Sequence, residues 1–246
     1  MDAVYKRSQL FEDFGHNFCP GCTHGVAHTA IMDTLDELGI KNEDTVAIYP
    51  VGCGVLGLLN TKHNVVHAAH GRAPAVATGV KRCAPEKFVF LYQGDGDLAS
   101  IGMAETIHMA NRGEKVTTIF INNTIYGMTG GQMAPTTLTG QIATTAPDGR
   151  GEHGEGPPIK MCEMIATLGE PKFVARYSLH NAANVLKARA GIRKAFQMQL
   201  EGKGYAFIEL LSMCPTGWKL SPKDSVKFME DRVLKTFPLG VFKEEV

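Results

Sequence analysis

The chain has 246 residues, of which 44% are hydrophobic and 20% are charged, an ordinary composition for a globular protein. Its 25 basic and 25 acidic side chains cancel, so no excess charge favours nucleic acid or an anionic membrane as a partner. No apolar run approaches the ~20 residues that span a bilayer, and residues 1–14 lack the apolar core of a signal peptide; we therefore expect a cytoplasmic protein without membrane contact.

Short apolar runs that are typical of buried parallel strands alternate with helical patterns along the chain. The predicted elements, in chain order, are a helix at 24–38, a strand at 45–49, a helix at 72–82, a strand at 88–92, a helix at 98–111, a strand at 116–121, a helix at 159–168, a strand at 173–177, a helix at 182–200 and a strand at 205–211. This alternation predicts an α/β fold with a doubly wound parallel sheet that binds ligands at the carboxyl ends of its strands. With no internal repeat or linker, residues 1–246 are expected to form one domain with short extensions at both ends.

A long segment at residues 127–158 does not fit the alternation. It is rich in Gly, Thr and Pro, has little periodicity and is too long for an ordinary connection. Loops of this length inside a domain are usually functional, so we expect this one to take part in binding.

A cluster of glycine and aspartate follows the strand at 88–92, in the order Gln93-Gly94-Asp95-Gly96-Asp97, and a helix begins at once. Glycines at such a turn let backbone amides face a phosphate, and the helix N-terminus adds partial positive charge. An aspartate would repel that phosphate unless it held a bridging divalent cation, and Mg²⁺ prefers such hard oxygen ligands. The next strand ends in Asn122-Asn123, at the adjacent strand end. Either motif alone is usually a turn or a strand end; together they predict a phosphate and Mg²⁺ site.

The segment from Gly94-Asp95-Gly96 to Asn122-Asn123 resembles the diphosphate-binding motif of thiamine pyrophosphate enzymes. Its continuation, Ile125-Tyr126-Gly127-Met128-Thr129-Gly130-Gly131-Gln132, is similar to the β subunit of 2-oxoacid:ferredoxin oxidoreductases, and the similarity covers nearly the whole chain. The resemblance implies a thiamine pyrophosphate-binding fold. It also implies that Mg²⁺ is held by Asp95, Asn123 and the main-chain carbonyl of Ile125. The cofactor itself would be contacted by Gly52, Cys53, Gly54, Gly94, Asp95, Gly96, Asp97, Asn123, Tyr126, Gly127 and Met128.

Six cysteines lie at positions 19, 22, 53, 83, 162 and 214. Disulfides are not expected in the cytoplasm, so the pair in Cys19-Pro20-Gly21-Cys22 points to metal or redox chemistry, although alone it leaves zinc, redox and structural roles open. Cys53 and Cys214 each follow a strand and are expected at the same edge of the sheet. Four converging cysteines suit a 4Fe–4S cluster, an arrangement that the resembling family has, whereas zinc could not accept an electron from the cofactor.

Two further points concern the cysteines. The family commonly reads Cys-Pro-Gly-Cys-Gly-His, but this chain has Thr23 between Cys22 and His24. Cys83 and Cys162 fall inside predicted helices without cysteine partners, and we expect both to be small buried apolar side chains.

The histidines divide into two groups. By resemblance, His24 would make a polar contact to the aminopyrimidine ring of the cofactor, and His70 would lie beside the thiazolium ring and the substrate as a catalytic residue. Helix capping or hydrogen bonding in the core remains the alternative for both. His63 and His67 are predicted to be surface or loop residues.

One catalytic group is missing from the sequence. Thiamine chemistry needs a carboxylate against the pyrimidine ring, and no glutamate here occupies a suitable apolar segment. In the resembling enzymes another subunit supplies it. The resemblance therefore implies an α-type subunit with the catalytic glutamate, a ferredoxin-like γ or δ subunit, ferredoxin as electron acceptor, and a 2-oxoacid and coenzyme A as substrates of an oxidative decarboxylation.

The substrate and the competing functions remain open. The glycine-aspartate segment and Ala134-Pro135-Thr136-Thr137 resemble the 2-oxoisovalerate type most, with the 2-oxoglutarate and pyruvate types as alternatives. A non-oxidative thiamine-dependent decarboxylase would share the Mg²⁺ motif but would not need four placed cysteines. A structural zinc protein or an electron-transfer module would leave the motif at 94–123 without a role.

Overall fold

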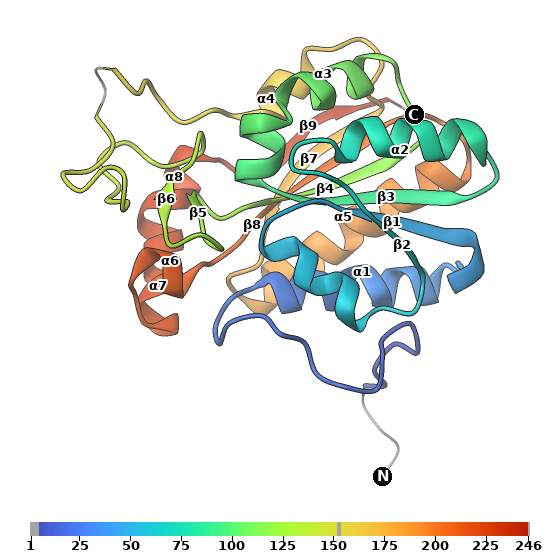
Figure 1. Cartoon of the computed structure of the whole chain (residues 1–246), viewed down its shortest axis with the longest axis horizontal. Helices are drawn as coiled ribbons and strands as arrows, with labels where there is room; N and C mark the ends of the chain where they lie inside the picture. Colours follow the sequence, from blue (N-terminus) through green and yellow to red (C-terminus); the bar gives the residue numbers. More distant parts are fainter. Residues whose placement is uncertain (1–4, 152–153, 246) are drawn as a thin grey trace.

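The computed structural model describes residues 5–151 and 154–245, which place a seven-stranded sheet between two layers of helices (Figure 1). The spatial order is β2-β1-β3-β4-β8-β7-β9, and all neighbours are parallel except β9, which runs antiparallel to β7. The strands are β1 (Thr45–Tyr49), β2 (Asn64–His67), β3 (Phe88–Gly94), β4 (Thr117–Asn122), β7 (Phe173–Ser178), β8 (Ala206–Leu211) and β9 (Gly240–Glu244). The predicted α/β fold with a doubly wound parallel sheet is confirmed, with β9 as an antiparallel addition at one edge.

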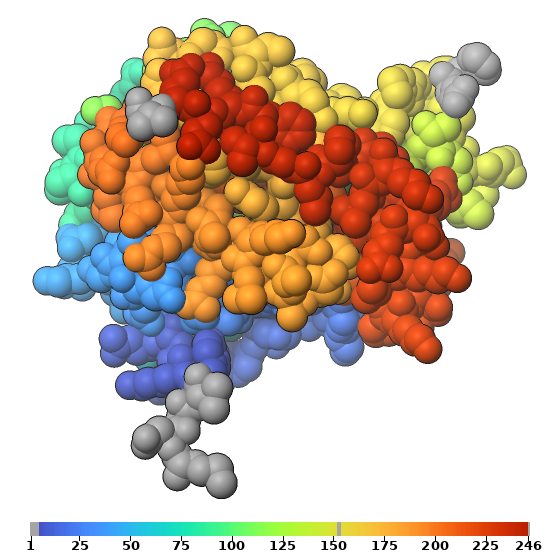
Figure 2. All heavy atoms as spheres, turned by 180° about the vertical axis from the view of Figure 1, so that it is seen from behind, coloured from blue at the N-terminus to red at the C-terminus, as the bar shows by residue number. Residues whose placement is uncertain are grey.

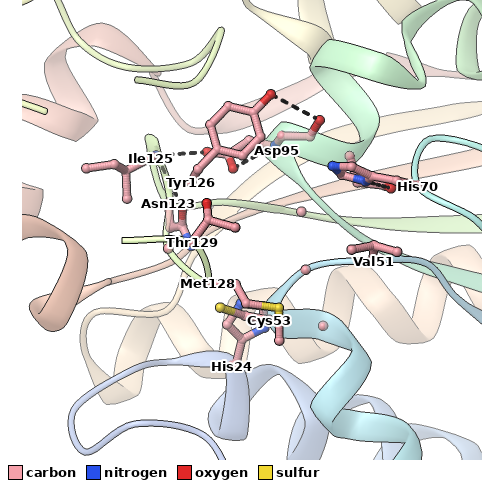
Figure 3. A pocket seen from close by; sticks show the side chains of 16 residues that line it. His24, Val51, Cys53, His70, Asp95, Asn123, Ile125, Tyr126, Met128 and Thr129 are labelled. Carbon is pink, nitrogen blue, oxygen red and sulfur yellow. Dashed lines mark hydrogen bonds and ion pairs between the residues drawn. The ribbon is translucent and has the colours of Figure 1, made fainter. Parts of the chain in front are cut away.

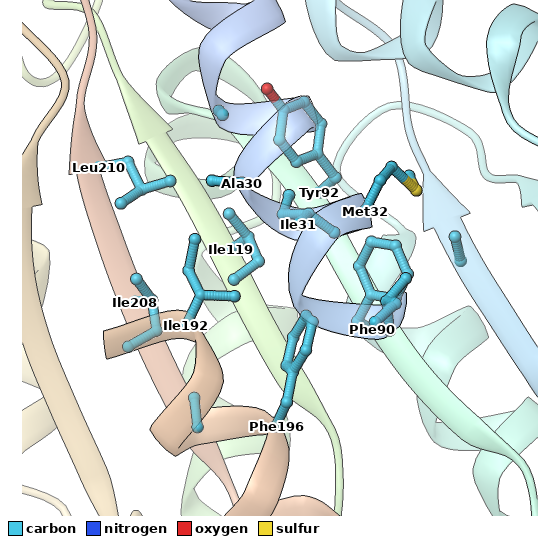
Figure 4. Close-up of a cluster of buried hydrophobic side chains, with 14 of the residues drawn as sticks. Ala30, Ile31, Met32, Phe90, Tyr92, Ile119, Ile192, Phe196, Ile208 and Leu210 are labelled. Atoms are coloured by element: carbon cyan, nitrogen blue, oxygen red, sulfur yellow. The ribbon is translucent and has the colours of Figure 1, made fainter. Parts of the chain in front are cut away.

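Helices cover both faces of the sheet (Figure 1). α1 (His24–Glu37) and α5 (Ala182–Leu200) pack together on one face, and α2 (Ala73–Cys83), α3 (Met103–Asn111) and α4 (Met161–Ala166) lie on the other. Every residue of the central strand β4 is buried, because helices cover it on both sides. Figure 4 shows the core beneath α1 and α5, where the side chains of Ile31, Phe90, Ile119, Ile192, Phe196 and Ile208 meet.

Several elements were not predicted. They are the edge strands β2 and β9, the hairpin of β5 (Ile125–Tyr126) and β6 (Gln132–Met133), 3₁₀ helices at Asn42–Asp44 and Cys53–Asn60, the short helices α6 (Pro215–Trp218), α7 (Pro222–Phe228) and α8 (Leu234–Thr236), and a π-helical turn at Met229–Val233. Each is short or lies at an edge, where periodicity is weak. Figure 2 shows the last part of the chain crossing the face opposite to that of Figure 1, where β9 completes the sheet beside β7.

The helix predicted at 98–111 is divided. A π-helical turn at Asp97–Ile101 precedes α3, and Gly102 separates them. A Cβ at Gly102 would lie 2.6 Å from the carbonyl oxygen of Asp97 and 2.8 Å from that of Gly71. The break therefore allows the backbone before α2 to approach this turn closely.

One side-chain prediction is wrong: Cys83 is exposed at the end of α2 instead of being buried. His63 lies in a bend just before β2, which agrees with the prediction of a surface or loop residue, but its side chain is buried beside Phe90. Cys162 is buried, as predicted. Among the described residues, no helix has both the length and the apolar character needed to cross a bilayer.

The segment at 127–158 is ordered by one arginine, and residues 152 and 153 of it lie outside the described part. The Arg150 guanidinium donates hydrogen bonds of 2.8–3.1 Å to the backbone carbonyls of Ala134, Pro135, Thr137, Glu155, Gly156 and Pro157. Six backbone acceptors around one buried cation fix the course of a segment that has little regular structure.

A buried ionic network lies between the sheet and α4. The side chain of Arg176 in β7 is fully buried, and its Nε lies 2.8 Å from Oε2 of the equally buried Glu209 in β8, although this N–H does not point at the oxygen. Its terminal nitrogens donate to Glu163. Burial alone would lower the pKa of Arg176, but the carboxylates of Glu209 and Glu163 outweigh this effect and raise it. Glu209 also accepts a 2.8 Å hydrogen bond from Asn122, at the end of β4.

Replacement of Arg176 by methionine should lower the free energy of unfolding by about 3–5 kcal/mol, because it leaves Glu209 charged and buried without its partner. Chemical denaturation measures the change. Arg193→Met is the matched control, since Arg193 pairs with Glu37 at the surface and should cost less than about 1 kcal/mol. Equal losses in the two variants would contradict the role of the network.

Buried His63 should make the fold sensitive to acid. Neither ring nitrogen has a hydrogen-bond partner among the described residues, and burial lowers the pKa of His63 to about 4. The unfolded ring titrates near 6.5, so the unfolded state binds the proton first, and stability should fall as the pH drops from about 6.5 towards 4.

The test compares His63→Leu with the parent protein at pH 7.5 and 5. The variant should lose less unfolding free energy over this interval, by about 1 kcal/mol or more. His67→Gln, at an exposed position of β2, serves as the control. A pH dependence that is unchanged in His63→Leu would show that another group carries the acid sensitivity.

Candidate functional site

A cavity opens at the carboxyl ends of the parallel strands, where the sheet topology places a ligand site. Its volume is about 590 Å³ with the mouth included, which suits a cofactor-sized molecule. The lining residues come from the first turn of α1, the segment after β1, the segment before α2, the end of β3 and the residues after it, and the segment after β4. They are His24, Val51, Gly52, Cys53, Gly54, His70, Gly94, Asp95, Gly96, Asp97, Asn123, Ile125, Tyr126, Gly127, Met128 and Thr129. All predicted cofactor and Mg²⁺ residues are therefore brought together, and Val51 and Thr129 are additions that the sequence pattern did not indicate.

The predicted Mg²⁺ ligands Asp95, Asn123 and Ile125 lie at one end of this cavity, and His24, Cys53 and Met128 lie at the other (Figure 3). The Ile125 amide is 3.2 Å from Oδ2 of Asp95 and 3.3 Å from Oδ1 of Asn123. Since one N–H contacts both oxygens, the two side chains converge on the same place. Burial raises the pKa of Asp95 to about 6, although hydrogen bonds from Thr136 and Gly96 oppose the shift. A cation beside this carboxylate would stabilise its charged form.

Hydrogen bonds from several segments fix the residues predicted to bind Mg²⁺. Thr124 has a positive φ of 63°, and its amide donates to the side chain of Asn122. The Trp218 indole donates a 2.8 Å hydrogen bond to the carbonyl of Asn123. The Thr136 hydroxyl donates a 2.7 Å hydrogen bond to Asp95. The contacts of Trp218 and Thr136 join segments far apart in the sequence, and they were not predicted.

The lining residues suit a diphosphate that arrives with a cation. Asp95 and Asp97 are acidic, and the lining set includes no lysine or arginine. The anion would therefore depend on a metal ion and on the amides of the glycine-rich turn. A side chain at Gly96 would collide with the ring of Tyr126, whose hydroxyl contacts the Gly96 carbonyl, so glycine is required for this arrangement.

Asp97 orients His70. Its buried Oδ1 lies 2.6 Å from Nδ1 of His70 and accepts a 2.6 Å hydrogen bond from the Gly71 amide, while its Oδ2 accepts from Gln93 at 2.8 Å. Because Nδ1 faces a carboxylate, the Nε2 atom of His70 remains for a ligand in the cavity. Asp97 lines the cavity as predicted, and both of its oxygens have protein partners.

His24 lines the opposite end of the cavity. Its Nδ1 shares a 2.7 Å hydrogen bond with the Tyr92 hydroxyl, and its ring stacks on Phe18 with centroids 5.1 Å apart. Burial lowers the pKa of His24 to about 4, so the ring is neutral at pH 7. A neutral imidazole with one engaged nitrogen can offer the other to a polar group.

Two of the four predicted cluster cysteines, Cys53 and Cys214, lie beside the cavity. A Cβ on Gly127 would lie 3.2 Å from the sulfur of Cys214 and 3.5 Å from that of Cys53. Burial, and to a smaller extent the nearby thiols of Cys22 and Cys19, raise the pKa of Cys53 to about 11. Thiolates at such positions need a positive centre. Within residues 5–151 and 154–245, no three His, Cys, Asp or Glu side chains lie close enough as they stand to enclose a metal ion.

Thr23 joins two of the cysteine segments. Its hydroxyl accepts a 2.9 Å hydrogen bond from the Met213 amide and lies 2.8 Å from the Ser212 hydroxyl, so the segments of Cys22 and Cys214 are tied together. The φ of Thr23 is −89°, a value that does not require glycine. The departure from the common motif therefore leaves the turn intact.

The comparisons with known proteins agree with this geometry. A profile of the family described as "Thiamine pyrophosphate enzyme, C-terminal TPP binding domain" matches residues 55–210. Ketoisovalerate oxidoreductase subunit VorA of Methanothermobacter thermautotrophicus is 48% identical over 241 residues, which cover 98% of this chain and 50% of the relative. 2-Oxoglutarate synthase subunit KorB of Methanocaldococcus jannaschii is 40% identical over 223 residues, covering 88% of this chain and 77% of the relative.

A solved structure extends the comparison. The 2-oxoglutarate:ferredoxin oxidoreductase from Magnetococcus marinus, with 2-oxoglutarate, coenzyme A and succinyl-CoA bound, matches with a TM-score of 0.79 and 25% identity, covering 99% of this chain and 86% of that chain. The present chain spans about half the length of the VorA relatives. The fold, the cavity at the strand ends and these matches together show that the chain belongs to the thiamine pyrophosphate-binding subunits of the 2-oxoacid:ferredoxin oxidoreductases.

Proposed function

We propose that this chain binds thiamine pyrophosphate, Mg²⁺ and a 4Fe–4S cluster in an enzyme that oxidatively decarboxylates a 2-oxoacid, with coenzyme A as acyl acceptor and ferredoxin as electron acceptor. The observation that carries the proposal is the convergence of Asp95 and Asn123 on the Ile125 amide, inside a cavity at the strand ends. Asp95, Asn123 and the Ile125 carbonyl would hold Mg²⁺. Residues 1–246 would act as one thiamine pyrophosphate-binding domain.

The protein residues have distinct tasks in this proposal. When bound, thiamine pyrophosphate supplies the electron sink for loss of CO₂. His70, fixed through Nδ1 by Asp97, would present Nε2 to the substrate, and neutral His24 would offer a polar contact at the other end of the cavity. Gly52, Gly54, Gly94 and Gly96 would let the backbone approach the cofactor.

The cluster would be held by Cys19, Cys22, Cys53 and Cys214. Cys53 both lines the cofactor cavity and lies near Cys214, so an electron acceptor here would adjoin the reacting centre. This adjacency favours an oxidative reaction over a non-oxidative thiamine-dependent decarboxylation, which needs no such acceptor, and over a structural zinc site.

Branched 2-oxoacids such as 2-oxoisovalerate are the proposed substrates. Val51 and Met128 at the cavity are 40% and 48% exposed and offer apolar surface, whereas the lining set has no lysine or arginine to pair with a second carboxylate. The match to VorA points in the same direction. 2-Oxoglutarate is the second candidate, because KorB and the solved 2-oxoglutarate enzyme are also similar. The kcat/KM values for the two acids and pyruvate would decide between them.

Partner subunits complete the proposal. The cavity lining contains no glutamate, so an α-type subunit would supply the carboxylate that activates the cofactor. A ferredoxin-like γ or δ subunit would carry electrons from the cluster to ferredoxin. The names of the relatives as subunits support an assembly of this kind.

Replacement of Asp95 by asparagine should weaken Mg²⁺-dependent binding of thiamine pyrophosphate at least about 100-fold, because it removes the charged ligand while keeping the shape. Equilibrium dialysis of the EDTA-treated, assembled enzyme measures this affinity. The control is Asp148→Asn, at an exposed position of the segment 127–158, which should bind thiamine pyrophosphate with the affinity of the parent. Undiminished binding by Asp95→Asn would remove Asp95 from the metal site.

Loss of one cluster cysteine should remove the iron bound to this chain. Anaerobically purified Cys214→Ala complex should contain about four fewer iron atoms for each copy of the chain than the parent, while it retains thiamine pyrophosphate. Cys83→Ala provides the control, because Cys83 is exposed on α2. If the iron and sulfide contents of Cys214→Ala equal those of the parent, the four-cysteine assignment and the oxidative mechanism are wrong.

A further inference from the structure

We propose that the Thr136 hydroxyl makes Asp95 a one-oxygen ligand and thereby sets the preference of the metal site for Mg²⁺ over Ca²⁺. This inference rests on the proposed cofactor function and adds a specificity-determining residue to it. Thr136 does not line the cavity; it acts on the metal through Asp95 as a positioning residue.

The two oxygens of Asp95 are in different situations. Oδ2 accepts hydrogen bonds from the Thr136 hydroxyl at 2.7 Å and from the Ile125 amide at 3.2 Å. Oδ1 accepts one from the Gly96 amide at 2.9 Å. A carboxylate oxygen has about two lone-pair positions, so Oδ2 is fully used and Oδ1 retains one. Only Oδ1 can then be offered to a cation without loss of a protein contact.

Thr136 is held rigidly enough to enforce this arrangement. It is fully buried in a turn closed by a 3.0 Å hydrogen bond from the Thr137 amide to the Ala134 carbonyl. The Thr137 hydroxyl donates to the Thr124 carbonyl, which ties the turn to the segment carrying Asn123. Arg150 binds the carbonyls on both sides of Thr136. The hydroxyl therefore cannot leave Asp95 without disturbing several other contacts.

Cation size explains why this matters. Mg²⁺ requires near-octahedral geometry and is bound by single carboxylate oxygens, whereas Ca²⁺ takes six to eight oxygens and often binds both oxygens of one carboxylate. A carboxylate with one blocked oxygen suits the smaller ion. Freeing Oδ2 would loosen the carboxylate for Mg²⁺ and offer Ca²⁺ an additional ligand.

The experiment measures thiamine pyrophosphate binding to the EDTA-treated, assembled enzyme by equilibrium dialysis over a series of Mg²⁺ and Ca²⁺ concentrations. Thr136→Val keeps the shape and removes the hydroxyl, and Thr136→Ser keeps the hydroxyl. Thr145→Val is the matched control: its hydroxyl accepts a hydrogen bond from the Met133 amide in the same loop, without contact to Asp95. Thr136→Ala replaces the valine variant if that variant does not assemble.

We expect the half-saturating Mg²⁺ concentration to rise about tenfold in Thr136→Val and the preference for Mg²⁺ over Ca²⁺ to fall by at least that factor. Thr136→Ser and Thr145→Val should behave like the parent. Equal weakening with both ions would indicate a merely structural role and overturn the inference, as would unchanged values. If the parent complex binds thiamine pyrophosphate with neither ion, the proposed function itself is wrong. If the parent binds the cofactor and Thr136→Val shows the same dependence on Mg²⁺ and Ca²⁺ as the parent, only the role of Thr136 is rejected.

Discussion

The burial of the Asp95 carboxylate at the end of β3 is the constraint on which the site depends. A charged group there loses hydration, and burial accordingly raises its pKa to about 6. The fold compensates with the Gly96 and Ile125 amides and the Thr136 hydroxyl, all directed at the two carboxylate oxygens. This set leaves one oxygen able to accept the proposed cation, which would offset the acidic, lysine-free cavity lining when an anionic ligand binds.

Rigid parts of the fold lie directly behind this site. Glu209 of the buried Arg176–Glu209 pair accepts a hydrogen bond from Asn122, so the ionic network of the sheet ends beside the proposed Mg²⁺ ligand Asn123. In the long segment at 127–158, where regular backbone hydrogen bonding is sparse, Arg150 fixes the backbone by donating hydrogen bonds to its carbonyls. In both places an arginine with several acceptors holds backbone or side chains that strand pairing alone would leave free. Stability and site geometry are therefore supplied by the same contacts.

Much of the framework could be predicted from the sequence. The strand at 45–49 and the helix at 182–200 have their predicted bounds, because β1 is a compact apolar run and α5 is long and capped by Asn181. The edge strand β2 was missed because its residues are only partly buried, and it gives no clear alternation. The helix at 98–111 was predicted without its interruption, since only the approach of Gly71 to Gly102 reveals why the chain breaks there.

The sequence by itself determined which groups meet: glycine and aspartate after one strand, asparagine after the next, and cysteines after two others come to one sheet edge once the strands are parallel. Only the tertiary structure decided how these groups are held. The hydrogen bonds from Thr136 to Asp95, from Trp218 to Asn123 and between Thr23 and Met213 join residues far apart in the chain. Local periodicity describes neighbours along the chain, whereas such contacts depend on how the loops close over the finished sheet.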